Sequence, residues 1–235
     1  MPKKASTEKQ PFAAEFASRR IKPAVKNQIK LQKKDAEANG DDRLKQIFFA
    51  AAQLFCEQGY DATTMSDIGD AIGVTKAAIY HFVPGGKQDL LFAIINYGMD
   101  TVDEMVIAPA REVEDAEQRL RAIIINHAKL VMRRSTEGGY NPVTVVVDEV
   151  ASLSPAQRKK IDQRKRAYMD LVRETLRQLQ DEGKFKEQLD VTVVAFSLIG
   201  TIIWLGHWYR PDGKLSSDQV ADIICRMALG GIMRS

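Results

Sequence analysis

Three histidines and two cysteines are the residues best suited to bind a metal ion or form a reactive centre. His81, His127 and His207 are far apart and do not have the spacing of a metal-binding motif. Cys56 and Cys225 form no C-x-x-C pair, which argues against a zinc knuckle or a disulfide framework and favours a reducing cytosol. The sequence therefore predicts no metal site and a cytoplasmic protein.

Motifs for nucleophilic catalysis and phosphate binding are also missing from the sequence. No G-x-S-x-G segment occurs. Residues 84–87 (PGGK) resemble a phosphate-binding loop only superficially, because they lack the leading glycine and the Ser or Thr after the lysine. The first ten residues, MPKKASTEKQ, have no apolar stretch of the kind found in secretion signals. We expect neither an enzyme nor a bound cofactor, and no export.

The charge is distributed unevenly along the 235 residues. The chain has 34 Lys and Arg against 31 Asp and Glu, with 45% hydrophobic residues, which is typical of a soluble globular protein and excludes a histone-like polycation. Residues 1–40 hold ten basic and four acidic residues, and the rest of the chain has a net charge of −3. We predict a disordered basic arm over residues 1–40, either a solubilising tail or a segment that follows a DNA backbone.

Three helices are predicted after the arm, and the residues at which they start and end indicate a helix-turn-helix. Apolar residues at helical spacing begin after Asp42, and Gly59 can end this first helix. Thr64 starts a second helix that Gly73 closes. Thr75 can then cap a third helix over residues 76–82. Two short helices joined by a tight turn that contains glycine are typical of DNA-binding proteins.

The string GYDATTMSDIGDAIGVTKAAIYHFVPGGKQDLL resembles the amino-terminal DNA-binding domain of TetR/AcrR-family transcriptional regulators, over residues 43–95. Val83 departs from the pattern, since many members have an aromatic residue there, but this side chain is expected inside the domain. The resemblance implies an all-α protein with a three-helix DNA-binding domain over residues 41–90 and a helical ligand-binding and dimerisation domain over residues 91–235. The family-typical positions are Gly59-Tyr60, Thr63-Thr64, Ile68, Gly73-Val74, Ile79-Tyr80, Lys87 and Leu90-Leu91.

Four residues of this domain suit contacts to the DNA backbone. Thr64 and Thr75 stand at helix starts, where the hydroxyl, the free amides and the helix dipole favour a phosphate. Tyr80 and Lys87 suit backbone contacts that set the register of the protein but not its sequence preference.

The third helix supplies the residues expected to read bases. Lys76 can bind guanine, the Ala78 methyl group can contact thymine, and His81 projects from the same helix, while Ile79 is expected to face the core. Residues 41–90 have a net charge of −3, which leaves this domain short of the positive charge that supports non-specific DNA affinity. The basic arm can supply that charge.

Residues 91–235 show helical rather than alternating periodicity and contain equal numbers of basic and acidic residues. Ser154 followed by Pro155, and Ser216 followed by Gln219, mark two helix starts clearly. The expected helices cover residues 88–107, 116–134, a stretch near 142–151, 154–182, 191–206 and 216–233.

The segment over residues 191–206 is apolar on all sides but too short for a good membrane span, so we expect a buried helix and no membrane association. The last helix carries an apolar stripe. The two helices either complete the core of one chain or form a four-helix interface in a homodimer, as TetR-family proteins do. A two-fold symmetric operator needs two DNA-binding domains, which we call reading heads, and this requirement favours the homodimer.

The sequence WLGHWYRPDG near residue 210, with RKRAY on the long helix before it, resembles TetR-family regulators of fatty-acid or sterol-ring catabolism that release DNA on binding acyl-CoA thioesters. The resemblance implies an apolar site for the acyl chain, aromatic groups that stack on adenine, and basic groups that pair with phosphates. The alternative is the solvated face of a helix beside a sealed core. The candidate ligand-binding residues are Arg166, Tyr168, Phe196, Trp204, His207, Trp208 and Arg210.

Three functions follow from these observations. The first is a homodimeric repressor that an acyl-CoA effector releases from a palindromic operator. The second keeps the same DNA-binding module but senses drugs or other hydrophobic compounds and controls an efflux gene. The third is an architectural protein that binds DNA without a specific site. A protected palindrome in a footprint would separate the third from the other two.

Overall fold

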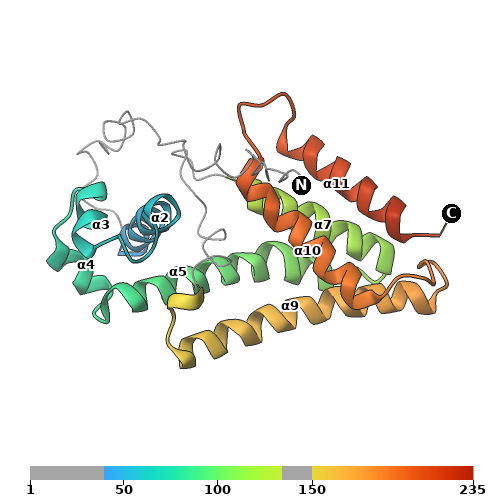
Figure 1. Cartoon of the computed structure of the whole chain (residues 1–235), viewed down its shortest axis with the longest axis horizontal. Helices are drawn as coiled ribbons and strands as arrows, with labels where there is room; N and C mark the ends of the chain where they lie inside the picture. Colours follow the sequence, from blue (N-terminus) through green and yellow to red (C-terminus); the bar gives the residue numbers. More distant parts are fainter. Residues whose placement is uncertain (1–39, 134–149, 235) are drawn as a thin grey trace, which may run out of the picture. The chain divides into compact units, whose positions relative to one another are not determined.

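The computed structural model describes residues 40–133 and 150–234 (Figure 1). The predicted basic arm, apart from Gly40, and most of the helix predicted near residues 142–151 lie outside the described residues. The described chain is helical, and an isolated antiparallel bridge between Phe185 and Met233 is its one strand-like pairing. The predicted all-α fold is confirmed.

The amino-terminal part forms the predicted three helices followed by a longer one. A Cβ atom on Gly69 would lie 2.6 Å from the carbonyl oxygen of Val74, which belongs to the turn between the two short helices. Glycine at this position therefore allows the helix over residues 65–72 to pack closely against the turn. Gly73 ends that helix in the left-handed conformation, with φ of 70°. These helices are α2 (Gly40–Gln58), α3 (Met65–Ile72), α4 (Lys76–Phe82) and α5 (Gly86–Val102).

One hydrophobic cluster holds these helices together. It includes Phe55 from α2, Ile68 from α3, Ile79 from α4 and Leu91 from α5, all fully buried. Val83, which replaces the aromatic residue of many TetR proteins, is also buried in it. We call this group of residues the reading-head cluster.

The carboxy-terminal part departs from the predicted pattern at one place. The helix predicted over residues 88–107 changes at Asp103 from α-helical to π-helical, and a short α-helix follows. A single wider turn leaves little trace in the spacing of apolar residues, so sequence periodicity missed it. The elements are the π-helix η2 (Asp103–Ile107), α6 (Ala108–Arg111), α7 (Ala116–Met132), the 3₁₀ turn η3 (Val150–Ser152), α9 (Pro155–Asp181), α10 (Val191–Trp208) and α11 (Ser217–Ile232).

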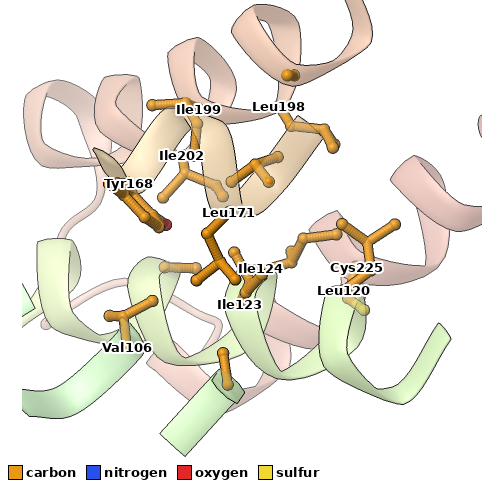
Figure 2. Packing of buried hydrophobic residues seen from close by; sticks show 14 of the residues in the cluster. Val106, Leu120, Ile123, Ile124, Tyr168, Leu171, Leu198, Ile199, Ile202 and Cys225 are labelled. Carbon is orange, nitrogen blue, oxygen red and sulfur yellow. The ribbon is translucent and has the colours of Figure 1, made fainter. Parts of the chain in front are cut away.

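Helix α7 is central to the second cluster, because α9, α10 and α11 all pack against it (Figure 1). Both predicted helix starts are confirmed: Ser154 caps α9 with proline at its first turn, and Ser216 with Gln219 forms a capping box on α11. Figure 2 shows how side chains from α7, α9 and α10 fill the space between these helices. We call this second group the sensor cluster.

Helix α10 is longer than predicted and is buried on one side only. Its 18 residues are long and apolar enough to cross a membrane by length and composition. Ala195, Ile202 and Leu205 are buried in the sensor cluster, whereas Phe196 and Trp204 are 57% and 60% exposed. The expected burial of this helix is therefore met on one side in the single chain, and much of the remaining apolar surface of α10 faces outward.

Candidate functional sites

The first candidate site comprises α3 and α4, each of which begins at a threonine cap. The Thr64 hydroxyl accepts a hydrogen bond from the Asp67 amide at 3.2 Å, and the Asp67 carboxylate accepts one from the Thr64 amide at 2.8 Å. The bond from the Thr64 amide lowers the pKa of Asp67, which keeps this carboxylate ionised. Thr75 accepts from the Ala78 amide at 3.1 Å. Both predicted caps are confirmed.

Helix α4 buries Ile79 and leaves polar side chains accessible. Lys76, Tyr80 and His81 are exposed. The Lys76 ammonium lies 5.9 Å from the centre of the Tyr80 ring, within range of a cation–π contact. Of the side chains predicted to contact DNA from this helix, Lys76, Tyr80 and His81 thus remain available and Ala78 is half-buried. Ile79 anchors the helix to the reading-head cluster.

Lys87, at the start of α5, holds the loop between α2 and α3. Its ammonium donates to the carbonyl oxygens of Tyr60, Asp61 and Thr63 at 2.8, 3.3 and 2.9 Å. It also lies 4.3 Å from the centre of the Tyr60 ring. Because an ammonium group has three N–H donors, these carbonyls use its full donor capacity. Sequence reasoning missed this structural role, since a loop closed by a lysine 24 to 27 residues away has no local signal.

The second candidate site is a polar pair inside the sensor cluster. The Tyr168 hydroxyl on α9 lies 3.0 Å from Nδ1 of His127 on α7, and both side chains are buried. Burial lowers the pKa of His127 to about 4 and raises the pKa of Tyr168, so both groups are neutral at pH 7. Tyr168 lies close to apolar side chains such as Ile202 and Leu171 (Figure 2), so a neutral polar pair is enclosed in the sensor cluster.

The third candidate site is an apolar surface on α10 and α11, which we call the outer face. Large apolar side chains on a single chain are normally scattered, but here they recur at helical spacing on two helices. Their exposed fractions range from 43% to 63%. The outer face comprises Val193, Phe196, Trp204 and Trp208 of α10 and Ile223 and Met227 of α11.

Known families match both parts of the chain. Residues 47–94 match the tetR family of bacterial regulatory proteins, and residues 113–232, about half of the chain, match the tetracyclin repressor-like C-terminal domain. The chain belongs to the TetR family. It is therefore a DNA-binding transcriptional regulator, and TetR-family regulators are homodimers.

Several TetR-family relatives match over most of their length. The transcriptional repressor KstR2 of Mycobacterium tuberculosis is 26% identical over an alignment of 200 residues, and the match covers 83% of this chain and 94% of KstR2. The fatty acid metabolism regulator protein of Bacillus subtilis is 25% identical over 188 residues, 80% of this chain and 94% of its own. The crystal structure of AibR in complex with isovaleryl coenzyme A and operator DNA superposes on this structure with a TM-score of 0.70. The sequences are 37% identical, and the match covers 79% of this chain and 97% of AibR.

The structure separates the ligand-binding residues that the sequence suggested for this TetR-family protein. Tyr168 alone lies in the sensor cluster, while Phe196, Trp204 and Trp208 belong to the outer face. His207 stacks on Trp204 with ring centres 4.4 Å apart. Aromatic residues on an apolar helix carry the same sequence signal on either face, which is why sequence reasoning grouped them.

The two predicted basic ligand residues lie elsewhere. Arg210 is exposed beyond the end of α10 and lies 3.8 Å from the Asp212 carboxylate. Arg166 contributes to a surface depression of about 490 Å³ at the first half of α9. This depression is lined by Leu153, Pro155, Arg158, Lys159, Asp162, Gln163 and Arg166, with three positive charges against one negative.

Proposed function

We propose that this TetR-family regulator acts in the cytoplasm as a homodimeric repressor that an acyl-CoA type effector releases from a palindromic operator. The observation that carries the effector class is the sensor cluster, which is apolar apart from the neutral pair of His127 and Tyr168 and the buried Thr175 of α9. The resemblance to AibR, whose structure contains isovaleryl coenzyme A and operator DNA, supports the same class. The proposal includes no catalytic reaction.

The DNA-binding role follows from the accessible residues around α4. Lys76, Ala78 and His81 read base edges in the major groove, and Tyr80 contacts the backbone. Thr64 and Thr75 present helix starts to phosphates. Lys87 acts by holding the loop in front of α3, and it reaches a phosphate only if it gives up one of its carbonyl partners.

The outer face supplies the dimer interface through the last two helices. Phe196, Trp204 and Trp208 lose water when a second copy covers them, and aromatic side chains contribute strongly to such interfaces. A two-fold axis through this face would present the two reading heads to successive half-sites, about 34–36 Å apart. The aromatic residues grouped by sequence as ligand contacts therefore serve primarily in dimerisation.

The effector's acyl group is expected to enter the sensor cluster, and its phosphates need basic residues at the surface. Among the described residues no aspartate or glutamate is buried, so the cluster offers no counter-charge to a cationic drug. Arg166, in the basic depression, is the better placed of the predicted phosphate partners, and Arg210 is the second.

The basic arm over residues 1–40 is proposed to strengthen DNA binding without reading sequence. Its net charge of +6 offsets the net −3 of residues 41–90. Neutralised phosphates release counterions, so the arm is expected to steepen the dependence of operator affinity on salt.

A thermal-shift screen combined with operator binding tests the effector class. Footprinting first locates the operator, and fluorescence anisotropy then follows release by CoA esters, free CoA, free fatty acids and quaternary ammonium drugs. We expect CoA esters to stabilise the protein and to weaken operator binding on the order of 100-fold, equivalent to roughly 3 kcal/mol of differential affinity. Arg166→Ala should weaken the response to CoA esters, and Arg177→Ala, on the exposed side of α9, is the matched control.

Two outcomes would overturn this assignment. Stabilisation and release by quaternary ammonium drugs, without a response to CoA esters, would favour an efflux regulator. A footprint without a protected palindrome would favour an architectural DNA-binding protein.

A further inference from the structure

Helix α9 is shared between the two hydrophobic clusters. Ile161, near its start, is fully buried in the reading-head cluster, together with Leu153 just before the helix. Tyr168 and Leu171, two turns later, belong to the sensor cluster. Helix α5 makes the same transition, since Met99 belongs to the first cluster and Val102 to the second. The two helices pack against each other where both change cluster.

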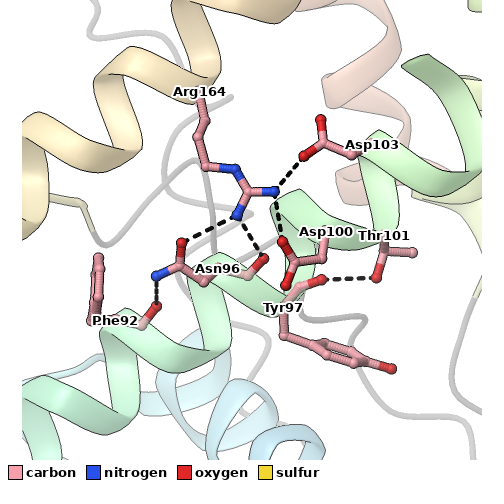
Figure 3. A network of polar contacts seen from close by, with 7 residues as sticks. All are labelled: Phe92, Asn96, Tyr97, Asp100, Thr101, Asp103 and Arg164. Atoms are coloured by element: carbon pink, nitrogen blue, oxygen red, sulfur yellow. Dashed lines mark hydrogen bonds and ion pairs between the residues drawn. The ribbon is translucent and has the colours of Figure 1, made fainter. Parts of the chain in front are cut away.

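Arg164 connects the two helices at this point (Figure 3). Its Nη1 donates to the side-chain oxygen and the carbonyl oxygen of Asn96 at 3.2 and 3.4 Å. Its Nη2 donates to the carboxylate of Asp100 at 2.7 Å and also to that of Asp103. We call Arg164 with Asn96, Asp100 and Asp103 the clamp.

The guanidinium group of arginine suits the geometry of the clamp. A planar guanidinium presents several donors in fixed directions and therefore can bind three side chains at once. The Arg164 side chain is 25% exposed, whereas the side chains of Asp100 and Asp103 are 68% and 49% exposed, so water screens these ion pairs from the carboxylate side. Partial burial alone would lower the pKa of Arg164, but the hydrogen bonds that it donates to Asp103 and Asp100 raise its pKa above the usual value.

The clamp lies where the backbone changes from the α-helix α5 to the π-helix η2. Asp103 is the first residue of η2, and π-helical turns are frequent at functional positions in helices. Val106 and Ile107 of this turn are buried in the sensor cluster. The clamp therefore fixes the junction between the part of the helix that belongs to the reading head and the part that belongs to the sensor.

Tyr168 lies four residues after Arg164, so the two side chains are neighbours on one face of α9. A ligand that displaces Tyr168 from His127 by shifting this turn of α9 would carry Arg164 with it. Movement of Arg164 changes its bonds to Asp100 and Asp103 and thereby the direction of α5.

We propose that the clamp is the coupling device that transmits effector binding from the sensor cluster to the reading head through α5. This inference rests on the proposed function, because it assumes a ligand that acts at the sensor cluster. It assigns to Arg164, Asp100 and Asp103 a role in coupling without direct contact to DNA.

The test measures the coupling factor, which is the ratio of operator dissociation constants with and without the CoA ester that releases the full-length wild-type dimer. The variants are Arg164→Gln and the double variant Asp100→Asn with Asp103→Asn. Arg177→Gln, an exposed arginine on the same helix, is the matched control. Isothermal titration of the same CoA ester without DNA reports binding by itself, and thermal unfolding reports folding.

We expect the coupling factor to fall from about 100 to below about 10 in both clamp variants, within the range of ordinary allosteric effects. Binding of the ester without DNA should change less than about threefold, and Arg177→Gln should behave as the wild type. If Arg164→Gln does not fold, Arg164→Lys keeps the charge but replaces the fork of the guanidinium, in which Nη1 binds Asn96 and Nη2 binds the carboxylates, by a single nitrogen. It should reduce the coupling factor in the same direction.

The results separate the clamp from the proposed function. If the ester releases the wild type and the folded clamp variants equally, the clamp does not couple the sites and this inference is wrong, while the proposed function stands. If no CoA ester releases the wild type, the proposed function fails and the inference fails with it. A fall in thermal stability with an unchanged coupling factor assigns the clamp a purely structural role and also contradicts the inference.

Discussion

Acidification from pH 7 to pH 5 should destabilise this protein through His127. The ring is buried against Tyr168 with its pKa lowered to about 4, whereas in the unfolded chain it titrates near 6.5. At a pH between these two pKa values, His127 is protonated in the unfolded state and neutral in the folded state. The stability that depends on a neutral His127 is therefore fully present above pH 6.5 and is lost as the pH falls toward 4.

The size of the effect follows from the two pKa values. Each unit of difference in pKa corresponds to about 1.4 kcal/mol. His127 therefore lowers the free energy of unfolding by roughly 3 kcal/mol per protomer once the pH is below about 4. Between pH 7 and pH 5 the expected loss is about 2 kcal/mol. That loss is a large part of the margin by which a typical domain is stable.

Urea unfolding at both pH values, at one fixed protomer concentration, measures this loss. The control is the double variant His127→Phe with Tyr168→Phe, which removes both partners and leaves no unpaired polar group. The remaining ionisable groups are common to both proteins, so their contributions cancel in the comparison. We expect the wild type to lose about 2 kcal/mol more than the double variant between pH 7 and pH 5. Equal losses in the two proteins would refute the assignment of a buried, neutral His127.

Four further predictions concern the caps, the loop, the dimer and the arm. Thr64→Ala should lower the free energy of unfolding by about 1 kcal/mol, measured with urea, because it removes the N-cap of α3; Ser66→Ala is the control. Lys87→Met should lower the free energy of unfolding by about 1–3 kcal/mol, because three carbonyl oxygens lose their hydrogen-bond donor. If operator binding instead becomes less dependent on salt and stability is unchanged, Lys87 contacts a phosphate. Met227→Glu should yield monomers in size-exclusion chromatography by placing a charge in the outer face, and an unchanged elution volume would place the interface elsewhere. Deletion of the arm over residues 1–40 should reduce operator affinity. It should also lower the salt slope by roughly 0.9 for each phosphate that the arm neutralises in the full-length protein, and an unchanged slope would exclude the arm from DNA binding.

The sequence by itself determined the reading head almost completely. Its helix starts at Thr64 and Thr75 and its turn at Gly73 depend on residues within a few positions of one another, and each was confirmed in the structure. The burial of Ile79 also follows from local spacing, because a short helix packed on one side must bury that side. Caps, turns and periodicity are local properties, so a single sequence is enough to predict them.

Only the tertiary structure decided which apolar face of α10 points inward, and with it the separation of Tyr168 from Trp204. A helix that is apolar on all sides has no polar face to fix its orientation, so packing against α7 and α9 sets it. The pairing of His127 with Tyr168 and of Arg164 with Asp100 joins residues 41 and 64 positions apart. Contacts of this kind arise when helices pack, and the local pattern of the chain carries no signal for them.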